Sequence, residues 1–266
     1  MNTNNIKFAH SSESNTTAPW DIPKRPNYDD MIFKEKYVDC QVKFQAGTTT
    51  WLRILPKLES SQHGWMMHVP LISYKGGRFV DPSFFRDNAK SVFNDANSWF
   101  KINAPGKLYS DSNKKGFKLF PTEYGVFWSL VQDESGPPSA LKLFVGSTFK
   151  GKTGGVGLGR LVWELTTELD ETGKPYSDPI DPDQGSLISI EKQQVAANKY
   201  PKFMLRRGKQ PLPVYGLIDK MTPEETDMLL PLEEIVRELT VDEQWKCLAS
   251  VIDPEIVEKI RASVGR

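Results

Sequence analysis

The chain has 266 residues, of which 38% are hydrophobic and 26% charged, proportions that are ordinary for a globular protein and allow a sizeable core. No stretch approaches the ~18 consecutive apolar residues that a membrane-spanning helix needs. The first residues also lack the charged and apolar regions of a signal peptide, so we expect a cytoplasmic protein with no membrane partner.

The charge of the chain changes sign along its length. Residues 217–266 hold 12 acidic and 6 basic side chains, a net charge of −6. Because the whole chain is neutral, the first 216 residues carry a net charge of +6. A basic body followed by an acidic segment favours an anionic partner for the body.

The sequence predicts neither a metal site nor a disulfide framework. A zinc site needs about four ligands at close spacing, and the chain has only scattered candidates, namely His10, His63, His68, Cys40 and Cys247. The acidic stretch at 178–185 lacks the spacing of a calcium-binding loop and is expected to be solvated. We therefore expect no metal and no other cofactor.

The chain is expected to begin with a polar arm and then to alternate strands with helices. Residues 1–27 are rich in Asn, Ser, Thr and Pro, which favours an arm without stable structure. The hydrophobic periodicities then predict, in chain order, a strand at 48–56, a strand at 65–74 ending in a Gly-Gly hairpin turn, a helix at 81–100, strands at 124–131 and 140–145, a helix at 159–169, a last strand at 187–193, and three short helices starting at Thr222, Thr240 and Asp253.

The alternation of side chains within the strands assigns their faces. In the first strand Leu52 and Ile54 share one face, so Arg53 is expected to point out of the core. Trp128 in the third strand and Trp163 in the helix after the fourth strand are expected to be core residues. The helix at 81–100 is predicted to start at an N-cap aspartate followed by proline, with an apolar stripe made of Phe85, Ala89, Val92, Phe93, Ala96 and Phe100.

Residues Gly146 to Thr153 match the phosphate-loop pattern of nucleotide hydrolases and follow a strand. That loop works only where a helix starts at its Lys-Thr pair and directs its N-terminal N–H groups at the phosphates. Here four glycines follow within six residues, and each costs a helix ~1 kcal/mol relative to alanine. We therefore expect the helix to start at about Gly159, and the segment to be a basic loop rather than an ATP site.

Basic and aromatic residues recur together in several segments, the combination that single-stranded nucleic acid requires for its phosphates and its unstacked bases. The residues from 192 to 209 include six Lys or Arg and no acid. The candidate contact residues are Trp51, Arg53, Trp99, Lys101, Lys107, Tyr109, Lys114, Lys115, Lys118, Tyr124, Lys150, Lys152, Lys199, Tyr200, Lys202, Phe203, Arg206 and Arg207.

The order of these motifs resembles a known family. The strand Thr122-Glu123-Tyr124-Gly125-Val126-Phe127-Trp128, the strand Trp51-Leu52-Arg53-Ile54, and the stretch Asn198-Lys199-Tyr200-Pro201-Lys202-Phe203 look like segments of the replicative single-stranded-DNA-binding proteins of T-even-like bacteriophages. The resemblance covers roughly residues 48–205. It departs at 81–118, where the family has a Cys- and His-rich zinc insertion and this chain has a predicted helix.

The resemblance implies an α+β protein built on an oligonucleotide-binding barrel, with helical insertions, that coats single strands in DNA replication, recombination or repair. Arg53, Lys118 and Tyr124 become the strongest contacts. We then expect a flexible arm at 1–27, the DNA-binding domain at 28–216 and an acidic helical segment at 217–266. Its partners would be single-stranded DNA, other copies along the strand, and replication or recombination proteins at the acidic segment, in a host cytoplasm if the source is a phage.

Two rival interpretations remain open on the sequence alone. The first is a phosphate-loop nucleotide hydrolase, which would be an enzyme. The second is a phage structural or interaction protein whose basic face is merely solvated. Our own expectation is a binding protein without catalytic residues.

Overall fold

The computed structural model describes residues 31–75, 77–110, 112–113, 115–132, 137–150, 156–168, 179–193 and 202–265. These segments form an α+β protein with a seven-strand antiparallel sheet and C-terminal helices. None of their helices is both long and apolar enough to span a bilayer. The expected arm at 1–27 and the candidate contacts Lys114, Lys152, Lys199 and Tyr200 lie outside the described residues.

The elements follow one another along the chain as the periodicities largely predict. The strands are β1 (Thr49–Ile54), β2 (Met67–Tyr74), β3 (Gly77–Val80), β4 (Thr122–Gln132), β5 (Pro138–Ser147), β6 (Ser186–Gln193) and β7 (Lys202–Pro211). The α-helices are α1 (Val92–Asn103), α2 (Leu158–Thr167), α3 (Tyr215–Ile218), α4 (Pro223–Met228), α5 (Leu232–Ile235), α6 (Val241–Ala249) and α7 (Pro254–Val264). Three 3₁₀ turns are η1 (Glu35–Cys40), η2 (Pro82–Phe84) and η3 (Pro105–Lys107). The expectation that β6 is the last strand is wrong, because β7 follows it.

The long strand β4 organises the sheet. It pairs with β5 along one edge, while on its other edge β2 pairs with its first half and β1 with its second half. The strand order is β3-β2-β4-β1-β6-β7, with β5 attached to β4 alone. The expected closed barrel is therefore wrong for the described residues. Irregular chain covers the edges instead, since Met31 bridges β3 at Phe79 and Gln41 bridges β5 at Leu143.

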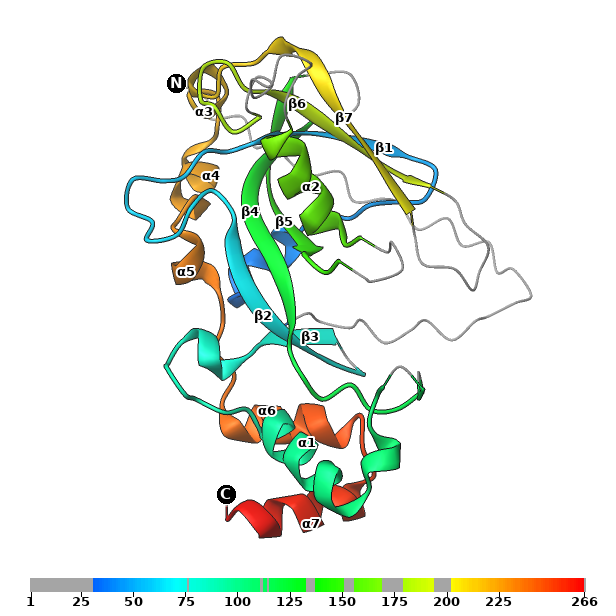
Figure 1. Cartoon of the computed structure of the whole chain (residues 1–266). Helices are drawn as coiled ribbons and strands as arrows, with labels where there is room; N and C mark the ends of the chain where they lie inside the picture. The colour runs from blue at the N-terminus through cyan, green and yellow to red at the C-terminus, as the bar shows by residue number, and fades with distance from the viewer. Residues whose placement is uncertain are drawn as a thin grey trace, which may run out of the picture.

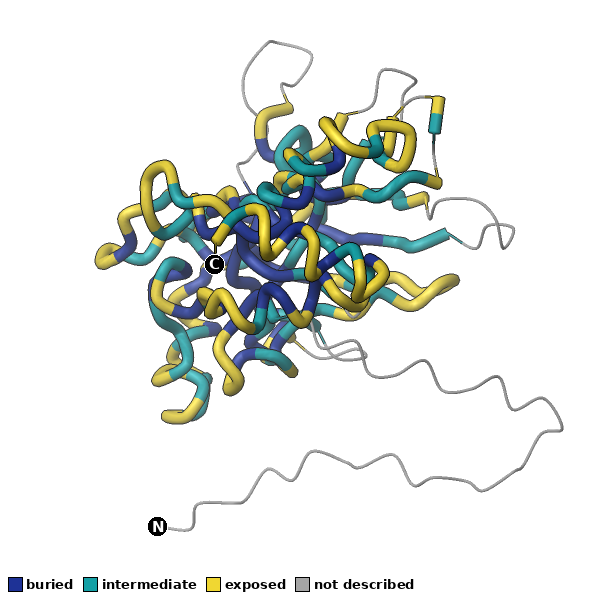
Figure 2. Tube along the Cα trace, turned by 90° about the horizontal axis from the view of Figure 1, so that it is seen from below, coloured by how far each residue is buried: buried dark blue, intermediate teal, exposed yellow. Residues whose placement is uncertain are grey.

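Three hydrophobic clusters hold the elements together. On the face of the sheet that carries Trp128, which we call the first face, the side chains of β2, β4 and β5 pack against η1, α3 and α5. On the second face, which carries Phe127, the side chains of β4 and β5 pack with those of β1 and β6 beneath α2. The third cluster joins the β2–β3 hairpin to α1, α6 and α7, and these helices lie at the end of the molecule opposite β6 and β7 (Figure 1). In Figure 2 the buried segments run through the middle of the trace.

The single helix expected at 81–100 is two elements. Asp81 does cap a turn that begins with proline, but this turn ends as the short η2. Asn88 then adopts a left-handed backbone conformation, φ 61°, which a continuing right-handed helix does not allow. The longer helix α1 begins only at Val92, where the Ser91 hydroxyl accepts a hydrogen bond from the Asn94 N–H.

Three helices of the acidic C-terminal segment begin where the sequence signals predict, and a further one, α5, begins at Leu232 without a predicted start. Thr222 and Thr240 each form a capping box with the glutamate three residues later, and Asp253 caps α7. Within this segment Leu232, Ile235 and Val236 are buried in the same cluster as β4. The segment is thus packed into the body along much of its length.

Candidate nucleic-acid interface

Arg53 was expected on the surface, and this expectation is wrong. Its side chain is 0% exposed. Its Nε donates to the Leu212 carbonyl at 2.8 Å, its Nη1 donates to the carbonyls of Ile54 and Pro179 at 2.8 and 2.5 Å, and its Nη2 donates to the Asp181 carbonyl. Alternation along β1 places Arg53 on the first face correctly, but segments more than a hundred residues away in the sequence cover that face. Arg53 therefore cross-links the body and is not a surface contact for DNA.

Beyond Arg53 the first face carries a row of side chains across three strands, in which the residues on β1 and β7 are exposed and the one on β6 is buried. Trp51 on β1 lies opposite Ser189 on β6, and Ser189 lies opposite Arg206 on β7. Directly opposed residues point to the same face, so an indole and a guanidinium flank a short serine. Trp51 is 36% exposed, and Arg206 and Lys202 are also exposed. We call Trp51, Lys202 and Arg206 the strand-edge surface; Ser189, which lies between them, is buried.

A second group of candidate contacts gathers in the connection between α1 and β4. The rings of Tyr109 and Phe120 lie 6.4 Å apart and both are exposed, and the Lys118 ammonium lies 5.4 Å from the Phe120 ring centre. Partial desolvation lowers the pKa of Lys118, although the residue as a whole is exposed. The exposed cations Lys101, Lys107 and Lys115 belong to the same part of the chain. The structure thus brings basic and aromatic side chains together here, as the sequence predicts.

Tyr124 does not join the strand-edge surface. It lies at the start of β4, whereas Trp51 is level with Gln132 at the far end, and eight residues of strand span about 27 Å. Between them the first face is buried beneath the chain around Leu230. Trp128 is buried there, and its indole Nε1 donates a hydrogen bond to the Leu230 carbonyl at 2.8 Å. Tyr124 itself is half-buried against that cluster, with the Arg78 guanidinium 5.0 Å above its ring. Tyr124 and Trp51 therefore do not belong to one exposed surface.

Three further candidate contacts turn inward. Phe203 packs against the second-face cluster with its ring 6.0 Å from that of Phe44. Arg207 lies opposite Ile188 and so points to the same second face, where it is half-buried. Trp99 packs against the cluster of α1, α6 and α7. All three side chains are half-buried, because alternate positions of β7 and one side of α1 face the core.

The glycines of the phosphate-loop match have a packing role. A Cβ on Gly146 would lie 2.6 Å from the Gly159 nitrogen, and one on Gly157 would lie 2.1 Å from the Ser147 carbonyl oxygen. Only glycine lets the end of β5 and the start of α2 approach so closely. The helix begins at Leu158, within one residue of the expected start and beyond the Lys-Thr pair, so the predicted late helix start is confirmed.

The two described basic residues around α2 both contact an acidic side chain. Lys150 Nζ and Arg160 Nε lie 3.4 and 2.9 Å from the same Oε1 of Glu164, which lies one helical turn after Arg160.

Sequence reasoning missed an aromatic group beside α2. The rings of Trp65 and Trp163 are stacked, with centres 5.8 Å apart and planes 9° from parallel. His68 meets Trp163 edge-on at 6.0 Å. Trp163, predicted as a core residue, packs against the second-face cluster and is half-buried. The two tryptophans are 98 positions apart in the sequence with no local basic neighbour of Trp65, so no pattern in the sequence links them.

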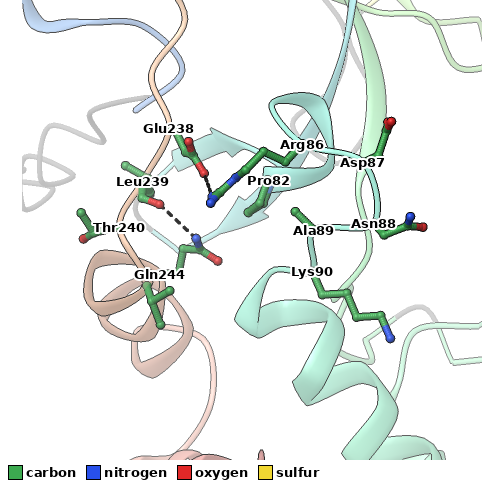
Figure 3. Close-up of a pocket in the computed structure, with 11 residues that line it drawn as sticks. Pro82, Arg86, Asp87, Asn88, Ala89, Lys90, Glu238, Leu239, Thr240 and Gln244 are labelled. Carbon is green, nitrogen blue, oxygen red and sulfur yellow. Dashed lines mark hydrogen bonds and ion pairs between the residues drawn. The ribbon is translucent and has the colours of Figure 1, made fainter.

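A cleft of about 620 Å³ lies away from all these groups, between the turn after η2 and the start of α6 (Figure 3). An Arg86–Glu238 ion pair spans it, and the Gln244 side chain accepts from the Val92 N–H and donates to the Leu239 carbonyl. Its lining contains no histidine, cysteine or serine. In the part of the chain that the structure describes, no three His, Cys, Asp or Glu residues lie together in a metal-binding arrangement.

No protein-family profile matches the chain, and no curated protein sequence matches it.

Proposed function

We propose that the protein binds single-stranded DNA without sequence preference, and that the strand-edge surface is its principal contact. The observation that carries the proposal is the cross-strand row in which an exposed Trp51 and an exposed Arg206 flank a short, buried Ser189. A base can stack on an indole whatever its identity, and a guanidinium pairs with phosphate. The distance between β1 and β7, about 10 Å across two strand spacings, lets neighbouring parts of one strand reach both side chains.

The fold supports this proposal in a further respect. We infer that the sheet is an opened relative of the oligonucleotide-binding barrel. In support, α2 follows β5 and covers the inner cluster formed by β1, β4, β5 and β6. The Arg53 hydrogen bonds hold β1 against the chain around residues 179–181, so the strand that carries Trp51 has a rigid base. A role in coating single strands during replication, recombination or repair would follow from such binding.

The proposal is tested by fluorescence anisotropy with a labelled oligothymidine and a duplex of equal length over a range of salt concentrations. We expect tighter binding to the single strand and an affinity that falls steeply with salt, because bound counterions are released. Trp51→Ala should weaken binding by about 1–3 kcal/mol with little change in the salt dependence. Arg206→Ala should reduce the slope of log affinity against log salt by about 0.7, the value for one phosphate of a single strand.

The matched control is Lys259→Ala, which removes one exposed positive charge from α7 at the other end of the molecule (Figure 1). Equal affinity for the duplex, or binding that does not respond to salt, would contradict the proposal. An equal effect of Arg206→Ala and Lys259→Ala would also refute the assigned surface. ATP hydrolysis by the purified protein would instead support the nucleotide-hydrolase alternative, and absence of any DNA binding at low salt would support the structural-protein alternative.

A further inference from the structure

A column of aromatic rings runs from the core to the surface on the second face of the sheet. Phe144 stacks on Phe127 with centres 4.3 Å apart, Trp65 contacts Phe127 at 5.3 Å, and Trp163 stacks on Trp65. The two phenylalanines are buried and the two tryptophans half-buried, so the column ends at the surface with Trp163. The packed inner rings hold the Trp163 ring in one orientation, which lowers the entropy cost of stacking a flat ligand on it.

Two cations lie beside the end of this column and converge on one carboxylate. Arg160, Trp163 and Glu164 are spaced so that they share one face of α2. Lys150 Nζ reaches the same Oε1 of Glu164 from the chain that follows β5, and the side chains of Lys150 and Arg160 remain 63% and 40% exposed. Because two positive charges meet one negative charge, the group keeps a net charge of +1.

The position of the Glu164 carboxylate is the one that a phosphate oxygen would take. In the described part of the chain Arg160 contacts Glu164 through Nε, so the two terminal nitrogens of its guanidinium can still turn toward an anion. The hydrogen bond from Arg160 lowers the pKa of Glu164, which is therefore ionised at neutral pH. An ionised carboxylate between these cations competes with any phosphate for them.

We propose that the group Trp65, Trp163, Lys150, Arg160 and Glu164, the tryptophan surface, binds one nucleotide unit of single-stranded DNA. The base stacks on Trp163 as the next ring of the column, and the phosphate replaces the Glu164 carboxylate at Lys150 and Arg160. The inference rests on the proposed function. It adds a second DNA contact, on the opposite face of the sheet from Trp51, and it assigns to Glu164 the role of a carboxylate that weakens DNA binding.

The sharpest test is a gain of affinity. In the full chain, Glu164→Gln removes the competing charge, so binding of an oligothymidine of about 16 nucleotides, the upper end of typical site sizes, should tighten several-fold at low salt. The control Glu258→Gln makes the same change in net charge at an exposed position on α7. Trp163→Leu should weaken binding about fivefold or more, and Trp163→Phe should restore most of it because the flat ring returns.

The outcomes separate the two proposals. If Glu164→Gln gains no more than Glu258→Gln, or if Trp163→Leu binds as well as Trp163→Phe, the tryptophan surface is refuted, while a loss in Trp51→Ala would still support the strand-edge surface. If the unaltered protein binds no single-stranded DNA, both proposals fall. Should Trp163→Leu lower the melting temperature so far that it is not folded, the Glu164→Gln comparison decides alone, since that carboxylate is on the surface.

Discussion

Arg53 gives the most direct prediction about stability. The guanidinium makes four hydrogen bonds to backbone carbonyls, three of them in segments far from β1 in the sequence. Arg53→Met would keep the length of the side chain and leave those buried carbonyls without donors. Hydrogen bonds to a charged group contribute about 1.5–3 kcal/mol each, but removal of the buried charge also relieves its desolvation cost, which is several kcal/mol.

The net loss in the free energy of unfolding should therefore be about 3 kcal/mol, near the lower end of the values found for broken buried ionic networks. For a chain of this size that corresponds to a fall in melting temperature of about 6–12 °C. Arg53→Lys should destabilise comparably, because an ammonium on a straight stem cannot reach carbonyls on three segments at once. Gly185→Ala should act on the same contact from the other side, since its Cβ would lie 2.5 Å from Arg53 Nη2 and 2.4 Å from the Asp181 carbonyl oxygen.

Thermal denaturation followed by circular dichroism measures these losses, and Arg206→Met on the exposed first face of β7 is the matched control. Hydrogen exchange should localise the effect of Arg53→Met to the chain around residues 179–185 and 212. If Arg53→Met and Arg53→Lys both melt within a degree of the unaltered protein, the reasoning about this buried cross-link is wrong. If Arg53→Met or Arg53→Lys keeps its stability but loses DNA binding, Arg53 contacts DNA directly, as the sequence suggests.

Three further predictions concern other contacts. Gly157→Ala should lower the melting temperature by several degrees because its Cβ would overlap the Ser147 carbonyl. We expect no ATPase activity in the unaltered protein, so neither Gly157→Ala nor Lys152→Ala should have an activity to remove. Trp128→Phe should cost about 1–3 kcal/mol by leaving the Leu230 carbonyl without its donor, as urea denaturation would show. Glu243 has its pKa lowered by the Thr240 N–H of the capping box, so its contribution is present above the unfolded pKa of about 4.3 and disappears as pH falls through the lower folded value. The loss in the free energy of unfolding that Glu243→Ala causes at pH 7 should therefore shrink as the pH falls, because the protonated carboxyl no longer makes this interaction; a loss that does not change between neutral and acid pH would contradict this linkage.

The elements that the sequence predicts well are those whose own residues decide the structure. The alternation in β1, β4 and β5 and the capping residues at Thr222, Thr240 and Asp253 are local signals, and the structure has elements at all of them. The strand β7 carries a comparable period-two signal, with Phe203 and Leu205 toward the core and Arg206 away from it. The Lys, Arg and aromatic residues of this segment fit nucleic-acid contact as well as a strand, so the sequence alone does not single out a strand here.

The candidate site was predicted less well because exposure depends on distant segments. Alternation assigns Arg53 to the face opposite Leu52, and the pairing with Leu130 agrees with that face. What buries it is the chain at 179–181 and at 212, whose positions no local pattern encodes. The same limit applies to Trp65 and Trp163, which meet only because α2 packs over the second face of the sheet.

The two proposed surfaces place a constraint on the path of DNA. Trp51 is on the first face and Trp163 is on the second, so one strand can reach both only by passing around an edge of the sheet. The edge at β7 is the suitable one, because β7 has no further strand partner among the described residues, carries Lys202 and Arg206, and lies against α2. It follows that oligothymidines of about 4 nucleotides, the lower end of typical site sizes, should occupy one surface only. For them the losses caused by Trp51→Ala and Trp163→Leu should not combine, whereas for about 16 nucleotides the two losses should add in free energy. Additive losses at the shorter length would mean that the strand does not take this route.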